Sequence, residues 1–235
     1  MRNYFSFGTI DSRDYGVYIS GTNVFNAPER AYELIEVPGR NGAVIGPERR
    51  FSNIELEYPA FIYSSFKSNI RGLCNALSAI NGYARLADSY HTDEFRMAVF
   101  INGVNVSPTR PIRAGEFDLY FSCKPQRYLT VGQTEVTVED GDSLTNPTRF
   151  ASLPRIEVAG YGDLQIGDQV ITIDDIWPSI VIDSELGDCF SGSYNANGQV
   201  SFSTNDLPVL TPGANEITFD NTITSVKITP RWWRI

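Results

Sequence analysis

Hydrophobic and polar residues alternate in short stretches along much of this 235-residue chain. In FSNIELEY (51–58), apolar side chains at Ile54, Leu56 and Tyr58 are separated by glutamates. A period of two predicts a strand with one buried and one wet face. The same reasoning predicts further strands in the first part of the chain, at 4–8, 15–20, 31–37, 83–90, 95–103 and 115–124.

One stretch in this first part has the period of a helix. Its apolar residues recur at spacings of 4, 3, 4 and 3, namely Phe66, Ile70, Leu73, Leu77 and Ile80. They form a single stripe along one helix face. Ser64 or Ser65 could cap its start, and Gly82 is placed to end it. We therefore expect one helix lying across a mostly antiparallel sheet or small barrel.

The second part of the chain shows no helical period. Short strand-like segments recur there between Gly, Asn, Asp and Pro turns, at 135–140, 155–160, 164–167, 169–174, 179–185, 198–203, 215–220 and 225–233. This spacing is typical of a β-sandwich or jelly roll.

Charge divides the chain at the same place. Residues 1–133 carry 14 Lys/Arg and 13 Asp/Glu, a net of +1, whereas residues 134–235 carry 5 and 15, a net of −10. This asymmetry predicts two domains, 1–133 and 134–235, that fold separately, with proteolysis near Gly132 or in GDSLTNP (141–147). An acidic second half also repels nucleic-acid backbones, so we expect no sequence-specific nucleic-acid binding.

The segment VPGRNG (37–42) carries two turn signals in succession. Pro38-Gly39 suits the centre of a type II turn, and Asn41-Gly42 suits a tight hairpin turn in which both residues take positive φ. One hairpin needs only one such device. We therefore expect a stiff, projecting loop that presents Arg40 and Asn41, with Pro38 to Gly42 as candidate contacts between subunits; a solvated hairpin tip is the alternative.

The composition argues against several other kinds of protein. No hydrophobic run is long enough to span a bilayer, and the start, MRNYFSFGTIDSRDYG, lacks the features of a signal peptide. We expect synthesis in a cytoplasm and no membrane insertion. Cys74, Cys123 and Cys189 are odd in number and far apart, which disfavours a disulfide framework or a zinc site, and no cofactor is predicted.

Candidates for catalysis are weak. His91, the only histidine, lies in the polar stretch YHTDEF with no nucleophile beside it, and is predicted to be a surface turn residue. Carboxylates at 174–175 and 183–185 could be a glycosidase pair or a calcium site, but turns and strand edges explain them as well. GDLQIGD (162–168) lacks the Lys-Ser/Thr of a phosphate loop. We expect no enzymatic activity.

Aromatic residues in the second part offer a binding alternative. Trp177, Trp232, Trp233 and Tyr194 could form a stacking platform for sugars, although tryptophans at the end of a last strand are more often core or interface anchors. The terminal run Arg231, Trp232, Trp233 and Arg234 also has the composition of a basic, aromatic docking tail.

Motifs spread over the chain resemble those of the distal tail protein of long-tailed bacteriophages, the hub of the tail tip or baseplate. They are FGTIDSRDYGVYIS (7–20), VPGRNG (37–42), YARLADS (83–89), FSCKPQRYL (121–129), NPTRFASLPRIEVAGYGDLQI (146–166), IVIDSE (180–185), LTPGANEI (210–217) and ITPRWWRI (228–235). None is highly specific alone, but their order extends over nearly the whole sequence.

The resemblance implies an N-terminal split β-barrel with one helix, which forms a sixfold ring continuing the tail tube, and a C-terminal galectin-like β-sandwich that projects outward. It also implies a place at the distal end of the tail in the virion. The partners would be further copies of the chain, the tail tube protein, the tail-associated tip protein, and receptor-binding or other baseplate proteins. The alternative is a carbohydrate-binding adhesin that contacts the host surface; a tail hydrolase is disfavoured because no catalytic set is visible.

Overall fold

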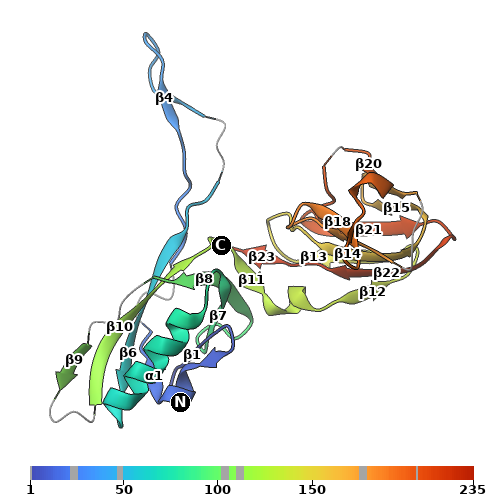
Figure 1. Ribbon diagram of the computed structural model, residues 1–235. Helices are drawn as coiled ribbons and strands as arrows, with labels where there is room; N and C mark the ends of the chain where they lie inside the picture. The colour runs from blue at the N-terminus through green and yellow to red at the C-terminus, as the bar shows by residue number, and fades with distance from the viewer. Residues whose placement is uncertain are drawn as a thin grey trace. The chain divides into compact units, whose positions relative to one another are not determined.

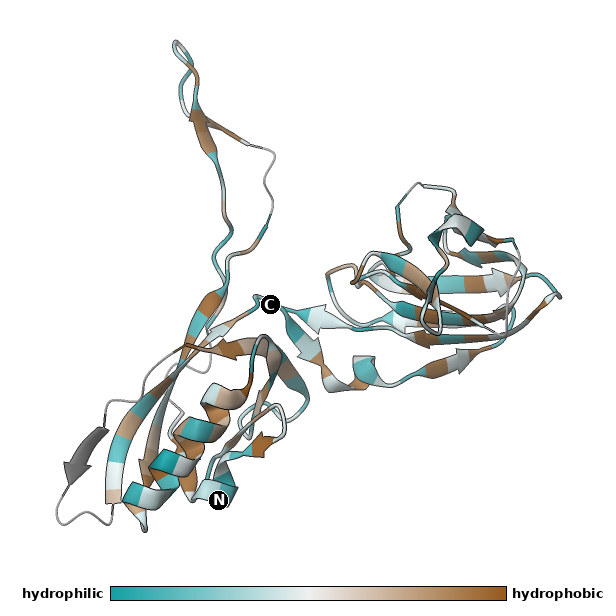
Figure 2. Ribbon diagram, viewed as in Figure 1, coloured by the Kyte–Doolittle hydropathy of each residue, from teal (hydrophilic) through white to brown (hydrophobic). Residues whose placement is uncertain are grey.

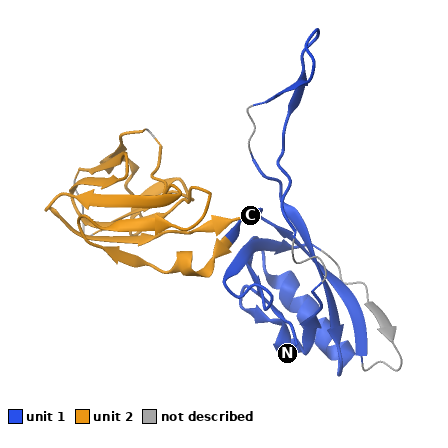
Figure 3. Ribbon diagram, turned by 180° about the vertical axis from the view of Figure 1, so that it is seen from behind, with its two compact units in different colours: residues 1–127, 235 blue, residues 128–234 orange. Residues whose placement is uncertain are grey.

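The computed structural model describes residues 2–21, 26–46, 50–101, 106–109, 114–174, 179–204 and 206–235, with only the backbone described at 106–109. The chain divides into two compact units, one of residues 1–127 together with Ile235 and one of residues 128–234 (Figure 3). The division lies a few residues before the expected 133/134 position. Separate folding of the two units stays a prediction.

The first unit is built on one curled antiparallel sheet. Its strand order is β2 (Ile10–Asp11), β1 (Phe5–Phe7), β7 (Ala84–Asp88), β8 (Glu94–Phe100), β10 (Ala114–Cys123), β6 (Ile54–Ile62) and β3 (Val17–Ile19). β9 (Val106–Thr109) adds to β10, and the 3₁₀ helix η1 (Ser12–Tyr15) precedes β3. The pair β6–β10 is the longest, with nine residues of each strand in register.

Helix α1 (Phe66–Ala79) packs on this sheet through the predicted stripe, with Phe66, Leu73 and Leu77 buried (Figure 1). It ends before Gly82, whose φ is +89°. The expected serine cap is wrong in detail. Ser65 precedes the helix with φ 52° and its side chain makes no capping bond; instead Ser68 Oγ donates to the Ser65 carbonyl at 2.9 Å.

The core of the first unit is aromatic. Phe5 stacks on Tyr58 with ring centres 5.7 Å apart, and Phe121 meets Phe5 edge-on at 5.8 Å. Gly115 on β10 lets the helix approach: a Cβ there would lie 2.3 Å from Phe66 Cε2. The close approach explains why a strand position next to the helix carries no side chain.

The second unit is a sandwich of two sheets (Figure 1). One has the order β12 (Val136–Val138), β22 (Ile223–Thr229), β14 (Arg155–Gly160), β17 (Ile180–Asp183), β18 (Asp188–Ser191) and β19 (Tyr194–Asn195). The other has the order β13 (Ser143–Asn146), β21 (Gly213–Phe219), β15 (Gly162–Ile166), β16 (Gln169–Ile173) and β20 (Val200–Phe202). The remaining elements are β11 (Arg127–Leu129), β23 (Trp233–Arg234), which pairs with it, and the 3₁₀ helices η2 (Thr130–Gln133) and η3 (Asn197–Gln199).

Apolar residues from both sheets form one core, including Ile156, Leu164, Ile182 and Ile217, each fully buried. The mainly-β class is thereby confirmed: a half-barrel sheet with one helix is followed by a β-sandwich. Among the helices of the described residues, none has both the length and the apolar character needed to cross a membrane.

The supposed linker GDSLTNP (141–147) is largely structured. Its residues 143–146 form strand β13, and Asn146 is buried, donating to the carbonyls of Phe150 and Leu210 at 3.0 Å each. Gly132, the other expected cleavage point, is also buried. Turn-forming composition suggested an open linker here, but the strand is held by its pairing with β21. We therefore no longer expect proteases to cut at these two places first.

Candidate assembly arm

The segment from Arg30 to Phe51, which we call the arm, lies between β3 and β6 in the chain. It projects away from the sheet at the end where β6 begins (Figure 1). Its base is held by an isolated antiparallel bridge between Arg30 and Phe51, with the Arg30 guanidinium 4.5 Å from the centre of the Phe51 ring. Further out, β4 (Leu34–Glu36) pairs with β5 (Ala43–Ile45), and Leu34 lies opposite Ile45. The arm is therefore a two-stranded ribbon.

The tip of the arm contains one of the two expected turns. The Arg40 N–H donates to the Val37 carbonyl at 3.1 Å, and Gly39 has φ +81°. With Pro38 before it, this is the predicted type II turn. The prediction of a second turn with positive φ at both Asn41 and Gly42 is wrong. Gly42 has φ +81°, but Asn41 does not adopt positive φ. A β-branched residue at 41 consequently meets no left-handed strain, so Asn41→Val is not expected to damage the loop through the backbone.

Most of the described residues of the arm are open to solvent. Every residue from 32 to 43 is exposed, including Leu34 (65% exposed) and, across the ribbon, Ile45 (60% exposed). Figure 2 shows apolar residues on the arm away from the body of the unit. An isolated two-stranded ribbon is at best marginally stable in water, and clustered exposed apolar residues mark interaction sites. The arm has the properties of a surface that is completed by a partner.

The terminal run behaves differently from the arm. Trp232 is 5% exposed, and its backbone and side chain pack on Gly132, where a Cβ would come within 2.5 Å of the Trp232 nitrogen. Trp233 stacks on Phe150 at 4.4 Å and donates its indole N–H to the Ala151 carbonyl. Arg234 is exposed. The tryptophans thus have structural roles within their own unit, while docking through Arg234 stays a prediction.

Arg231 belongs to a buried polar cluster in the second unit. Its guanidinium donates to both carboxylate oxygens of Asp183, at 2.6 and 2.8 Å, and lies 3.7 Å from Glu185. The hydrogen bonds that the guanidinium donates to Asp183 raise the pKa of Arg231. Tyr128 donates its hydroxyl to Glu185 at 3.1 Å. The carboxylates at 183–185 are therefore explained by a structural ion pair, rather than by the glycosidase pair considered from the sequence.

The proposed sugar platform is not assembled by the described residues. Trp232 is in the core, Trp233 is covered on one side by Phe150, and Tyr194 lies on strand β19. Trp177 and Asp175 lie outside the described residues. In the described part of the chain no group of three or more His, Cys, Asp or Glu side chains could hold a metal ion.

His91 is not the surface residue expected from its polar surroundings. Its side chain is only 14% exposed, and Nδ1 lies 3.2 Å from Asp88 Oδ1. Asp88 also accepts the Tyr58 hydroxyl at 2.7 Å. Burial, followed by the nearby Asp88 charge, raises the pKa of Tyr58 well above its ordinary value. This cluster ties the turn after β7 to the core.

Two buried arginines beside this cluster had no sequence signal. Arg127 donates to Glu94 at 2.7 Å, and Arg96 donates to the Pro125 carbonyl at 3.4 Å. Burial, with the neighbouring Arg127 charge, lowers the pKa of Arg96 to about 10. The adjoining cavity has a volume of about 20 Å³, which is enough for one water and too little for a substrate. The cluster is therefore structural in character.

Comparison with solved structures shows the class of fold. The chain superposes on the SPP1 Dit protein, described as a paradigm of the hub adsorption apparatus in phages that infect Gram-positive bacteria, with a TM-score of 0.74, 12% identity and full coverage of both chains. A chain of the phage p2 baseplate in its activated conformation with Ca matches with a TM-score of 0.53, 9% identity and 97% coverage of each chain.

The same baseplate in its activated conformation with Sr matches with a TM-score of 0.52, 9% identity and 96% coverage of each chain. No protein-family model matches the sequence, and no curated protein sequence matches it either. The fold is thus that of phage tail hub and baseplate proteins, which confirms the resemblance noted in the sequence.

Proposed function

We propose that this protein is a structural hub of a phage tail tip or baseplate, that it forms a sixfold ring at the distal end of the tail, and that it has no catalytic activity. The match of fold to a tail hub protein over the whole of both chains carries this proposal. Because the identity is only 12%, the function rests on the fold together with the surface of this chain.

The arm supports self-assembly. Its exposed apolar residues need a partner, and the Pro38-Gly39 turn limits the entropy that the tip loses on binding. In a ring, each subunit presents one surface to the next and receives a different one. The tip, Pro38 to Gly42, is suited to this repeated contact, and the five donors of Arg40 could engage a carboxylate or backbone carbonyls on the neighbour.

The charge distribution fits the two roles of the units. Residues 1–133, with a net charge of +1, can pack closely against copies of themselves, whereas residues 134–235, with −10, are better kept apart at the periphery. The ring would join the tail tube protein to the tail-associated tip protein. The outer sandwich would support receptor-binding or other baseplate proteins.

Negative-stain microscopy and light scattering of the purified chain test this proposal, with the chain alone and with the chain mixed with the tail tube protein of the same phage. We expect rings of six subunits, at high concentration or with the tube protein present. A strict monomer under both conditions would overturn the ring. A sugar-dependent rise in melting temperature without rings would favour the adhesin instead, and turnover in a cell-wall degradation assay would contradict a purely structural role.

A further inference from the structure

A second exposed surface of the first unit lies on the pair β6–β10. Alternate residues of both strands point into the core, so the residues between them face outward: Glu55, Glu57, Pro59 and Phe61 on β6, and Glu116, Asp118, Tyr120 and Ser122 on β10. In register, Phe61 lies opposite Glu116 and Pro59 opposite Asp118. Apolar and acidic side chains therefore share one end of this face.

This end of the face is hollowed. A groove of about 470 Å³, which we call the β6–β10 groove, is lined by Ser20, Pro59, Ala60, Phe61, Glu116, Phe117 and Asp118. Glu116 and Asp118 are exposed, and neither forms an ion pair with another described residue. Among the described residues, the groove thus offers two carboxylates without a cationic partner, beside an apolar wall.

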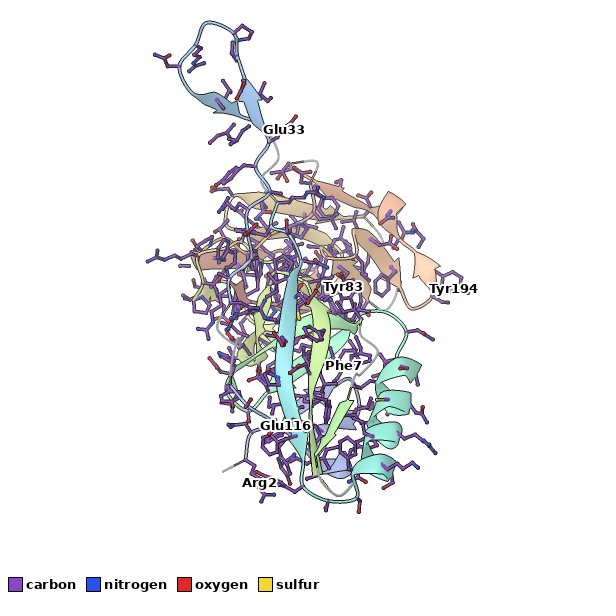
Figure 4. All side chains as sticks on the ribbon, turned by 90° about the vertical axis from the view of Figure 1, so that its left-hand side faces the viewer. Arg2, Phe7, Glu33, Tyr83, Glu116 and Tyr194 are labelled. Atoms are coloured by element: carbon purple, nitrogen blue, oxygen red, sulfur yellow. The ribbon has the colours of Figure 1, made fainter. Side chains whose placement is uncertain are left out.

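The apolar wall extends beyond the groove. Phe61 contacts Tyr18 and Tyr63, with ring centres 6.0 and 5.0 Å apart, and Tyr63 is 56% exposed. Arg2 lies over the Tyr63 ring at 4.4 Å. Figure 4 shows Glu116 and Arg2 toward one end of the sheet and Glu33, on the arm, beyond the other end. The groove and the arm are therefore at opposite ends of strand β6.

The arm has the complementary chemistry. Its exposed apolar side chains include Leu34, Val37 and Ile45, and Arg40 at the tip forms no ion pair within the described part of the chain. An apolar ribbon with a cation at its tip matches an apolar groove with two carboxylates. Because β6 runs from the arm toward the groove, at about 3.3 Å per residue, the arm points away from the groove of its own chain.

We propose that the arm of one copy docks in the β6–β10 groove of the next copy, with Arg40 between Glu116 and Asp118 and the apolar arm residues against Pro59 and Phe61. This inference rests on the proposed self-assembly and names its two contacting surfaces. Each chain then gives one arm and receives one, which is a heterologous contact, the kind from which a closed ring can be built. The same contact would also stabilise the arm, because a two-stranded ribbon that is only marginally stable alone would then pack against the sheet of the neighbouring copy.

Charge reversal in the full-length chain tests the pairing. Arg40→Glu and Asp118→Lys each place like charges across the contact, so each variant alone should raise the concentration needed for half-assembly by at least about tenfold. Mixing the two variants in equal amounts should restore rings, because the two kinds of chain can alternate and every contact is then between opposite charges. Light scattering and microscopy measure both effects.

Matched variants separate this contact from general charge effects. Arg71→Glu, on the exposed side of α1, and Glu55→Lys, on the same sheet face but outside the groove, should assemble like the wild type. Each variant's melting temperature as a monomer shows whether it folds. If the wild type forms rings while either reversed variant assembles equally well, or the mixture stays unassembled, the docking is wrong and the hub function stands.

If the wild type forms no ring with or without the tube protein, the proposed function fails together with the docking. If Arg40→Glu weakens only binding to the tube protein, the arm's partner is another tail protein and this inference is overturned.

Discussion

The ion pair between Arg231 and Asp183 should hold the second unit together. The two side chains are joined by bidentate bonds of 2.6 and 2.8 Å, and the Asp183 side chain is only 4% exposed, against 17% for Arg231. Such fork-to-fork pairs are the strong class of charged hydrogen bond. Replacement of Arg231 by Met removes the charge while keeping much of the stem.

The expected loss of stability follows from the Asp183 charge that the substitution leaves buried without its partner. Removing one partner of a buried pair costs about 3–5 kcal/mol because the other charge stays buried. Asp183 keeps two further bonds, from the backbone N–H groups of Glu185 and Leu186 at 3.1 Å each. We therefore expect Arg231→Met to lower the free energy of unfolding by an amount at the lower end of this range, about 3 kcal/mol. For a unit of this size that corresponds to a fall in melting temperature of about 12 °C or more.

The pH dependence gives a second, independent test. Burial raises the pKa of Asp183, but the hydrogen bond from Arg231 and the backbone bonds outweigh it, so the folded pKa lies below 3.8. A lowered pKa contributes stability that is present above the unfolded value and is lost as the pH falls through the folded value. Without Arg231, the pKa of Asp183 loses one of the interactions that lower it, while burial still raises it. The difference in the free energy of unfolding between the wild type and Arg231→Met should thus be largest near neutral pH and become smaller in acid.

Urea unfolding followed by tryptophan fluorescence measures this unit selectively, since all three tryptophans, at 177, 232 and 233, belong to residues 128–234. The double variant Asp183→Asn/Arg231→Met, which leaves no buried charge, should recover most of the loss. A difference between Arg231→Met and wild type below about 0.5 kcal/mol, the usual effect of a surface change, would refute the reasoning, as would a gap that does not change with pH.

Three further results are expected. Gly115→Ala should destabilise the first unit by about 1–3 kcal/mol in thermal unfolding because its Cβ meets the Phe66 ring at 2.3 Å, while Gly198→Ala, which meets no atom within 4 Å, serves as the neutral control. His91→Ala should cost about 1–3 kcal/mol, and a loss under 0.5 kcal/mol would show that its contact with Asp88 contributes little. Brief trypsin treatment of the unassembled chain should cut first after the exposed Arg40; mass spectrometry that finds first cleavage elsewhere would contradict an open arm.

The sequence alone determined the elements whose pattern is local. A period of two set β6 and β10, a period near 3.6 set α1, and Pro38-Gly39 set the turn at the arm tip. Alternation also fixed which residues of β6 face the core, because a strand buried on one face leaves little choice. The two-unit, mainly-β architecture follows from the spacing of these elements.

The tertiary structure decided which residues far apart in the chain lie in contact with one another. His91 is polar and lies in a polar stretch of sequence, yet the fold leaves its side chain only 14% exposed and places it beside Asp88, which also accepts the Tyr58 hydroxyl. Arg231 belongs to a run with the composition of a docking tail, yet it binds Asp183, which lies 48 residues earlier in the chain at the end of β17. The β6–β10 groove carries no motif at all, because Phe61 and Glu116 become neighbours only through strand register. Burial and charge pairing depend on contacts between residues far apart in the chain, and local pattern contains no information about which of them meet.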